Sequence, residues 1–383
     1  MQKVLHACAN YIKMTDKILW LICICTSAFG AALVYSATRT ASGAQFRTQV
    51  VAIVIGYVAA FIITKIDYEK IASAWILIAI LCLGLMAATS ILGVRVEGAD
   101  DKAWIILPGG ISFQPSELVK IGFIVTFAKH LDALRKRNKL TSFWHVMLLC
   151  VHMAIPVGII HLQGDDGAAL VFLFIFLAMC FGAGIQLRYF AALGATICAA
   201  VPLAWKYVLN TDQKKRIQIL FDHNLDPLGY GYQQGQGEIS IGSGMMNGRG
   251  LYQGPRVARG IVPEDHNDFI FSVVGEELGF IGCVAVLALI GLILFKIMMV
   301  ARSTKDPLGK YICFGFFGLL AFQAIENIGM CLYLLPVVGI TLPFFSAGGS
   351  STACLYLGVG LVQSVYMHRK RANDIDMDLA FEE

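Results

Sequence analysis

Acidic residues and a histidine crowd the segment 263–268, which reads Pro-Glu-Asp-His-Asn-Asp and leads straight into the apolar run that begins at Phe269. Ionisable groups at membrane depth are costly, so they usually face a cavity and serve a function. Asp268 is the last polar residue before this run, and a carboxyl group half removed from water has a raised pKa that suits a general base. We therefore expect the chemistry at Asp268. The alternative is that Asp268 only caps the helix that follows.

Other ionisable residues fall inside apolar runs. Glu117 and Lys120 stand at positions i and i+3, so on a helix they share one face and can pair. Such a pair either lines a polar cavity or is purely structural. Glu276, Glu277 and Glu326 are further acids of this kind, and for them we favour a structural role in buried polar networks.

Glycines and hydroxyl residues precede the last apolar run, where 346–351 reads Ser-Ala-Gly-Gly-Ser-Ser. Free backbone N–H groups at a helix start suit an anion such as a phosphate, although these residue types also simply cap helices. The sequence has no Walker A loop, no dinucleotide-binding glycine fingerprint, no His/Cys cluster with metal spacing and no Gly-x-Ser-x-Gly elbow. These absences argue against ATP-driven transport and against a serine hydrolase.

The composition is that of an integral membrane protein. Of the 383 residues 57% are hydrophobic and only 15% are charged, whereas a soluble protein carries about a quarter charged residues. The apolar runs have the length of membrane helices and lack the alternation of membrane strands. The net charge of +4 is small and lies mostly in short loops, so it indicates orientation and no nucleic-acid partner.

The predicted fold is all-α, with about ten membrane helices in a domain that covers 1–372 and a short acidic cytoplasmic tail at 373–383. Basic residues gather in the short loops of one side, which places both termini in the cytoplasm. The opposite side holds one large outer loop, about 208–267, whose many glycines either let the backbone approach a ligand or make the loop flexible. The expected spans are roughly 18–38, 49–66, 72–93, 114–130, 143–161, 167–184, 188–207, 268–299, 309–335 and 349–367.

Three segments together resemble the SEDS family of bacterial cell-wall proteins, which includes RodA, FtsW and SpoVE. Residues 114–120 look like the family's QPSE-x-x-K, and 263–279 look like its PE-x-H-x-DFIF-x-x-x-GEELG. Residues 327–351 look like its NIGM…LLP…G…LPF…GGSS. The similarity runs from about Asp16 to Arg371, which is most of the chain.

The resemblance implies a multi-pass protein of the bacterial cytoplasmic membrane that polymerises lipid II into glycan strands on the outer face, for cell shape, division or the spore wall. It implies a class B penicillin-binding protein as partner, besides lipid II and the membrane lipids. The family's essential aspartate falls on Asp268, which we interpret as the general base. A basic side chain or a bound divalent cation, Mg²⁺ or Mn²⁺, would offset the charge that grows on the leaving diphosphate. The expected substrate contacts are Trp104, Glu117, Lys120, Asp165, Arg216, Glu264, His266, Asn327, Ser346, Gly348, Gly349 and Ser350.

The chain departs from the family pattern around these residues, which affects substrate contacts more than the reaction. Ala103 precedes Trp104 where the family has arginine, and Lys102 stands one position earlier. The family's QPDLGT reads QGDDGA at 163–168, so Asp165 is kept. Further replacements are Gly237, Ser240, Met245 and Ala347.

Two other functions compete with the polymerase. A lipid II flippase would use Glu117, Lys120 and Glu277 along a polar path, but it needs polar groups through the full depth of the membrane, and the cytoplasmic half is mostly apolar. A non-catalytic scaffold would only recruit the penicillin-binding protein through small-residue helix faces, and it has no reason to keep Asp268 together with Glu117 and Lys120.

Overall fold

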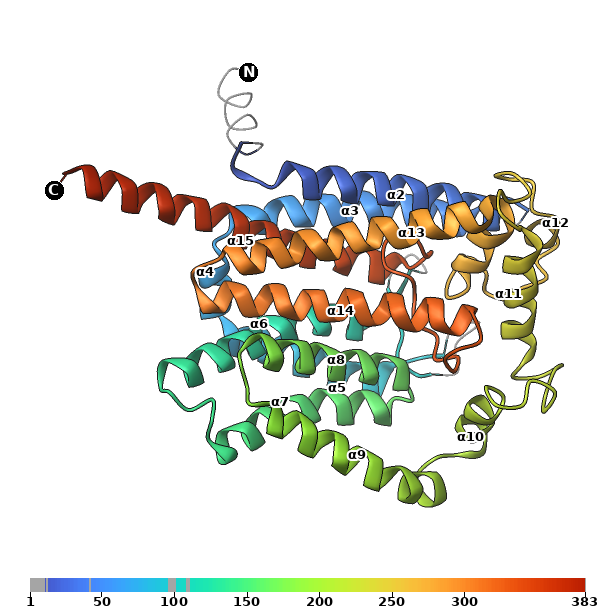
Figure 1. The fold of residues 1–383 in the computed structure, drawn as a ribbon, viewed down its shortest axis with the longest axis horizontal. Coiled ribbons are helices and arrows are strands. Elements are labelled where there is room, and N and C mark those ends of the chain that lie inside the picture. The colour runs from blue at the N-terminus through green and yellow to red at the C-terminus, as the bar shows by residue number, and fades with distance from the viewer. Residues whose placement is uncertain (1–10, 12, 41–42, 96–100, 108–110, 383) are drawn as a thin grey trace.

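The chain folds into one bundle of long helices that run side by side (Figure 1). The computed structural model describes residues 11, 13–40, 43–95, 101–107 and 111–382.

Ten long helices make up the bundle in this described part of the chain, and each coincides with one predicted span. Seven of them, all except α6, α8 and α15, are long and apolar enough to cross a membrane. The all-helical membrane fold is therefore confirmed, while a total of ten spans stays a prediction. The helices are α2 (Lys17–Thr38), α3 (Ala44–Lys65), α5 (Trp75–Leu92), α6 (Pro115–Lys136), α7 (Phe143–Leu162), α8 (Asp166–Gly182), α9 (Leu187–Tyr207), α13 (Ile270–Ser303), α14 (Pro307–Cys331) and α15 (Gly349–Glu382).

Two details differ from the predicted spans. The third span begins as a separate short helix, α4 (Tyr68–Ser73), because the backbone of Ala74 leaves the helical conformation before α5 starts. The chain also contains one small antiparallel sheet, in which β1 (Ile105–Leu107) pairs with β2 (Ile111–Phe113).

The predicted outer loop is folded rather than simply flexible. It contains α10 (Thr211–Gln218), α11 (Tyr232–Ser243) and α12 (Pro255–Ala258), which lie together at one end of the bundle (Figure 1). The turns that follow α3, α6 and α13, which carry the basic residues, lie at the opposite end with the last turns of α15. The basic turns thus gather at one end of the bundle, while the side of the membrane that each end faces stays a prediction.

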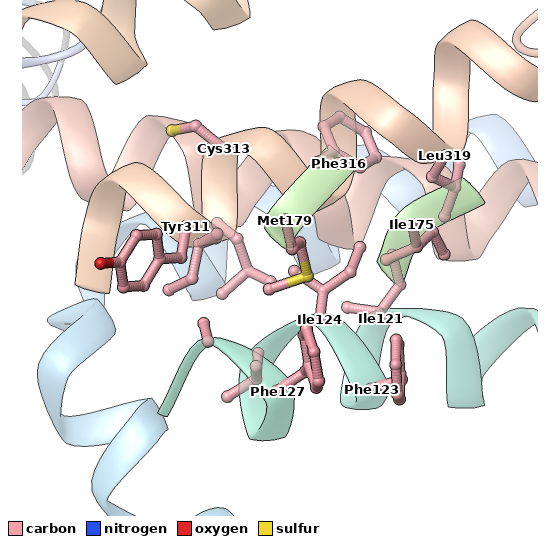
Figure 2. Packing of buried hydrophobic residues seen from close by; sticks show 14 of the residues in the cluster. Ile121, Phe123, Ile124, Phe127, Ile175, Met179, Tyr311, Cys313, Phe316 and Leu319 are labelled. Carbon is pink, nitrogen blue, oxygen red and sulfur yellow. The ribbon is translucent and has the colours of Figure 1, made fainter. Parts of the chain in front are cut away.

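The core of the bundle lies where α6, α8 and α14 meet (Figure 2). Ile124, Phe127, Met179 and Phe316 are buried there. A Cβ atom on Gly315 of α14 would come within 2.8 Å of both Ile124 and Met179. A residue without a side chain therefore lets the three helices approach closely, as is common between membrane helices.

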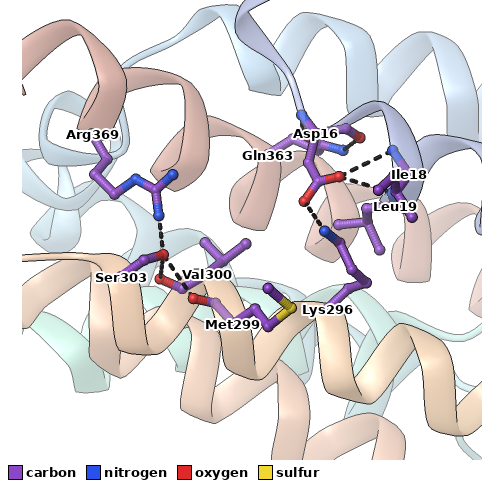
Figure 3. A network of polar contacts seen from close by, with 9 residues as sticks. All are labelled: Asp16, Ile18, Leu19, Lys296, Met299, Val300, Ser303, Gln363 and Arg369. Atoms are coloured by element: carbon purple, nitrogen blue, oxygen red, sulfur yellow. Dashed lines mark hydrogen bonds and ion pairs between the residues drawn. The ribbon is translucent and has the colours of Figure 1, made fainter. Parts of the chain in front are cut away.

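A polar network joins three helices at the end of the bundle away from α10, α11 and α12 (Figure 3). Asp16 caps α2, because its Oδ1 accepts hydrogen bonds from the backbone N–H groups of Ile18 and Leu19. Its Oδ2 lies 2.7 Å from Nζ of Lys296 in α13. The Gln363 side chain in α15 exchanges two hydrogen bonds with the backbone of Asp16. The network fixes the start of α2 and the last turns of α13 against the middle of α15.

Helix α13 is kinked at Gly279, whose φ of 64° no ordinary side chain adopts easily. The backbone N–H of Phe280, which follows the kink, donates to the carbonyl oxygen of Met245 at 2.8 Å. The segment 270–278 is thus separated from the apolar segment 280–303, and it begins next to Asp268.

Candidate active site

A compact turn brings the chain to Asp268. Glu264 has a positive φ of 53°, and its carboxylate accepts a hydrogen bond from Asn267 Nδ2 at 2.6 Å. Its carbonyl oxygen accepts from the backbone N–H of Asn267 at 3.0 Å and of Phe269 at 3.4 Å. The turn therefore fixes the backbone immediately before and after Asp268.

Helix α14 holds Asp268 through the main chain. Asn327 Nδ2 donates to the carbonyl oxygen of Asp268 at 2.6 Å and to that of Ile340 at 2.8 Å. The Asp268 carboxyl group itself caps no helix, since α13 has Phe269 at its N-cap and no side-chain capping bond. Its Oδ1 is enclosed and has no hydrogen-bond donor among the described residues. The capping interpretation of Asp268 is therefore wrong, and its carboxylate is not used as a cap for α13.

The surroundings of Asp268 prepare it to take a proton. Burial raises the pKa of its carboxyl group to about 7, and the negative charge of Glu264 acts in the same direction. The charges of His266 and Arg216 oppose the rise. A carboxylate with a pKa close to neutral is both ionised often enough and basic enough for general-base work.

His266 is positioned by two acids of the same turn. Its Nδ1 lies 3.6 Å from Oδ1 of Asp265, and its Nε2 lies 4.0 Å from Oε2 of Glu264. Burial disfavours the imidazolium, but the hydrogen bond to Asp265 and the charges of Glu264, Asp265 and Asp268 outweigh it and raise the pKa of His266. The neighbouring acids therefore favour the protonated form of the His266 ring.

A second polar group forms around the start of α6. Lys120 is fully buried, and its Nζ lies 2.7 Å from Oε1 of Glu117, so the predicted ion pair is confirmed. Asp165 caps α8 through a 2.8 Å bond from the Ala168 N–H, and it accepts a 2.8 Å bond from Gln114 Nε2. Burial raises the pKa of Asp165 to about 6, and the nearby Lys120 charge lowers it. Sequence reasoning named Glu117, Lys120 and Asp165 as contacts but did not name Gln114, which bonds Asp165.

The loop between α14 and α15 connects the two polar groups. The N–H of Ala347 donates to the carbonyl oxygen of His266 at 2.8 Å. Ser350 Oγ accepts a hydrogen bond from the Gln114 N–H at 3.3 Å. Ser346 steadies the loop, because its Oγ accepts from the Leu342 N–H at 2.8 Å.

The predicted anion site at the start of α15 is partly used by internal bonds. The Gly348 N–H donates to the carbonyl oxygen of Ser346 at 3.0 Å, and Ser351 Oγ donates to the carbonyl oxygen of Gly348 at 3.1 Å. Gly349 is the first residue of the helix. The glycines thus shape the loop beside both polar groups.

Arg216 belongs to the outer segment, the name we give to residues 208–267, which include α10, α11 and α12. It lies in α10, and its Nη1 donates to the carbonyl oxygen of Val337 at 3.2 Å. Together with Gly229, Tyr230, Gln233 and Val337 it lines a hollow of about 330 Å³. The positive charge of Arg216 acts to lower the pKa of Asp268.

Trp104 stands apart from these contacts. Its carbonyl oxygen accepts a hydrogen bond from the Val94 N–H at 2.9 Å. Its indole Nε1 is enclosed without an acceptor among the described residues. Among the described residues, no hydrogen bond joins Trp104 to the turn at Asp268 or to the polar group at the start of α6.

Glu276 and Glu277 serve the structure of the outer segment. The Glu276 carboxylate accepts from the N–H groups of Arg256 at 2.7 Å and Val257 at 3.2 Å. The Glu277 carboxylate accepts a hydrogen bond from Ser36 Oγ at 2.6 Å, and further hydrogen bonds from the backbone N–H groups of residues 252 and 254. The structural role predicted for these two acids is confirmed. Glu326 differs, because both of its carboxylate oxygens are enclosed and neither has a donor among the described residues.

Metal-binding residue types are expected to hold a divalent cation if the reaction uses one. In the described ranges, no three His, Cys, Asp or Glu side chains are grouped so that they could hold an ion. The predicted divalent cation therefore has no ligand set assigned to it.

Comparison with known proteins gives one consistent result. The family model FTSW_RODA_SPOVE, described as cell cycle protein, matches residues 16–371. A probable peptidoglycan glycosyltransferase FtsW from Geobacter metallireducens is 32% identical over 369 residues, which cover 94% of this chain and 96% of that protein. Peptidoglycan glycosyltransferase MrdB from Escherichia coli K12 is 31% identical over 358 residues, covering 93% and 94%.

Solved structures agree with the sequence relatives. A chain from a peptidoglycan synthase complex that coordinates polymerization and crosslinking superimposes with a TM-score of 0.81 at 30% identity, covering 93% of this chain and 98% of that one. The rod shape determining protein RodA of Thermus thermophilus gives a TM-score of 0.69 at 28% identity, covering 93% and 97%.

Proposed function

This chain belongs to the FtsW/RodA/SpoVE family and is a peptidoglycan glycosyltransferase of the bacterial inner membrane, and we propose that it polymerises lipid II with Asp268 as general base. In this reaction a sugar hydroxyl of one lipid-linked chain attacks the anomeric carbon of another. A new glycosidic bond forms, the bond to the diphosphate breaks, and the hydroxyl proton passes to Asp268.

The observation that carries this proposal is the state of the Asp268 carboxyl group. One oxygen is enclosed without a donor, the backbone is held by Asn327, and the pKa is raised to about 7. A base fixed in this way contributes roughly 10²–10⁴-fold to a proton-transfer step.

The leaving diphosphate needs a cation, and Arg216 suits that role better than Lys120. Lys120 is fully buried, whereas a diphosphate needs a cation that it can reach. Arg216 lines the hollow of the outer segment, and its charge acts to lower the pKa of Asp268. A guanidinium group can bind two phosphate oxygens at once, which supports the negative charge as it develops.

A class B penicillin-binding protein is the proposed partner, because the similar solved chain belongs to a complex that couples polymerization with crosslinking. Glycan strands become a wall only when they are cross-linked. A direct complex would deliver each new strand to that second reaction.

The test is polymerisation of labelled lipid II by the purified protein in liposomes, with a class B penicillin-binding protein present. Wild type should give a ladder of glycan strands, and Asp268→Asn should give at least about 10²-fold less polymer. Asp212→Asn is the matched control, because Asp212 is an exposed aspartate of the same outer segment.

The outcomes separate the three functions. A full ladder from Asp268→Asn would move the base to another residue. No polymer from wild type, together with transfer of labelled lipid across the bilayer, would support the flippase. Neither polymer nor lipid transfer, with the partner still bound, would support the scaffold.

A further inference from the structure

Gln49 is a buried side chain of α3 that has no part in the proposed reaction. Only 1% of its surface is exposed. Its Nε2 donates to the carbonyl oxygen of Ser346 at 3.0 Å, and its Oε1 accepts from Thr352 Oγ1 at 3.3 Å. A carbonyl oxygen can only accept, so the NH₂ side of the amide must face Ser346. Gln49 thus holds α3 against the place where the loop after α14 enters α15.

The peptide group that Gln49 contacts is also bonded at its other end. The carbonyl oxygen of Ser346 and the N–H of Ala347 belong to one planar peptide group, so fixing one end orients the other. The Ala347 N–H donates to the carbonyl oxygen of His266 at 2.8 Å. Hydrogen bonds at the two ends of one amide also polarise each other. A single peptide group therefore connects a side chain of α3 to the residue two positions before Asp268.

The loop has further hydrogen bonds around this peptide group. The Gly348 N–H donates to the same carbonyl oxygen of Ser346 at 3.0 Å. Ser346 Oγ accepts from the Leu342 N–H at 2.8 Å, which closes the turn that comes before the peptide group. These two bonds lie within the loop, so they set its shape. The bond from Gln49 sets the place of the loop against α3.

The turn at 264–268 is held from outside at two carbonyl oxygens. Ala347 holds that of His266 at 2.8 Å, and Asn327 Nδ2 holds that of Asp268 at 2.6 Å. The first donor belongs to the peptide group that is bonded to α3, and the second is a side chain of α14. Loss of either donor lets the backbone at Asp268 shift, and a misplacement of about 1 Å at a reacting group costs roughly 10²-fold in rate.

We propose that Gln49 is a positioning residue for the general base. It holds the 346–347 peptide group in the orientation that keeps the carbonyl oxygen of His266 bonded, and this fixes the backbone next to Asp268. The inference rests on the function proposed for Asp268. Because Gln49 acts through the backbone of the turn, its loss should lower kcat and leave KM unchanged.

Kinetics of lipid II polymerisation test this role. Gln49→Met keeps an unbranched side chain of similar volume but loses the bond to Ser346, so kcat should fall about tenfold or more, with KM within about twofold of wild type. Thr352→Val is the matched control, because it removes the other hydrogen bond of the same amide and leaves the bond to Ser346 in place. Its kcat should stay within about twofold of wild type. Thermal unfolding in detergent shows whether both variants fold.

Hydrogen exchange of the Ala347 amide tests the structural step without substrate. Peptides that cover 344–350 report it by mass spectrometry on the protein in detergent. The amide should be protected in wild type, because it is bonded to His266. In Gln49→Met it should exchange at least about tenfold faster, since the peptide group can then turn away from His266. In Thr352→Val its rate should stay within about twofold of wild type.

Four outcomes would overturn the proposal. An unprotected Ala347 amide in wild type would show that the link to His266 is not formed. Unchanged exchange in Gln49→Met would show that Gln49 does not hold the peptide group. Unchanged kcat despite faster exchange would show that the peptide group does not position the base. An equal loss of kcat in Thr352→Val would show a general weakening of the bundle.

The exchange measurement separates this proposal from the proposed function. It needs neither lipid II nor a partner, so its result stands whether or not polymer is made. Absence of polymer from wild type would refute the polymerase function, whereas unchanged exchange in Gln49→Met would refute the role of Gln49 alone.

Discussion

The surroundings of the Asp268 carboxyl group act on its pKa in opposite directions, and their balance leaves that pKa near neutral pH. Burial and Glu264 push the pKa up to about 7, while His266 and Arg216 push it down. Activity that needs the ionised base must therefore fall as the pH falls through about 7, because the carboxylate becomes protonated there. Each neighbour tunes the pH at which this happens.

Replacing His266 tests this balance. In His266→Gln the positive charge beside Asp268 is lost, so the pKa of Asp268 should rise and the acid limb of kcat/KM should move upward by roughly half a unit to one unit. The measurement is lipid II polymerisation across a pH series. His223→Gln is the control, because His223 is exposed in the outer segment, stacked on Tyr333. A downward shift in His266→Gln would mean that the ring does not act on Asp268 as a cation.

Local spacing predicted some contacts of the site and not others. Glu117 and Lys120 are neighbours on one helix turn, so their ion pair follows from the sequence. The link from Gln114 to Asp165 joins residues 51 positions apart, and no local pattern contains it. The isolation of Glu326 could not be predicted either, since a lack of partners depends on every surrounding element.

At the scale of elements, the apolar runs predicted the helices well because membrane length and composition leave few alternatives. The kink in α13 escaped prediction, because a glycine in an apolar run is common in membrane helices. Its cause lies in the outer segment. A Cβ atom on Gly279 would come within 2.4 Å of the backbone nitrogen of Gly248 and 2.7 Å of the carbonyl of Met246. The close approach of two backbones requires a glycine with positive φ there.

Gly279→Ala should therefore destabilise the protein strongly, by roughly 3 kcal/mol or more, because it adds backbone strain and a clash with backbone atoms. Gly291→Ala is the matched control in the same helix, since a Cβ there meets nothing within 4 Å. That change should be neutral or stabilising by about 0.5–1 kcal/mol. Thermal unfolding in detergent measures both. Equal melting temperatures for the two variants would contradict the role given to Gly279.

The candidate active site and the polar network around Asp16 lie at opposite ends of the bundle. The outer segment with α10, α11 and α12 lies at the end where α13 begins, next to the site (Figure 1). The ion pair of Asp16 and Lys296 lies toward the other end and joins α2 to α13, and Gln363 of α15 bonds the backbone of Asp16 (Figure 3). Helix α13 runs between these two ends.

Breaking the pair at the far end should thus weaken the whole bundle. Lys296→Met leaves the enclosed Asp16 carboxylate without its cation, which should cost roughly 3–5 kcal/mol of unfolding free energy. Lys305→Met, at an exposed lysine just after α13, should change it by less than about 0.5 kcal/mol. Adding Asp16→Asn to Lys296→Met should recover part of the loss, because the uncompensated charge is then removed as well. Unfolding in detergent measures all three variants. If the double variant is no more stable than Lys296→Met, the charge on Asp16 is not what destabilises the bundle.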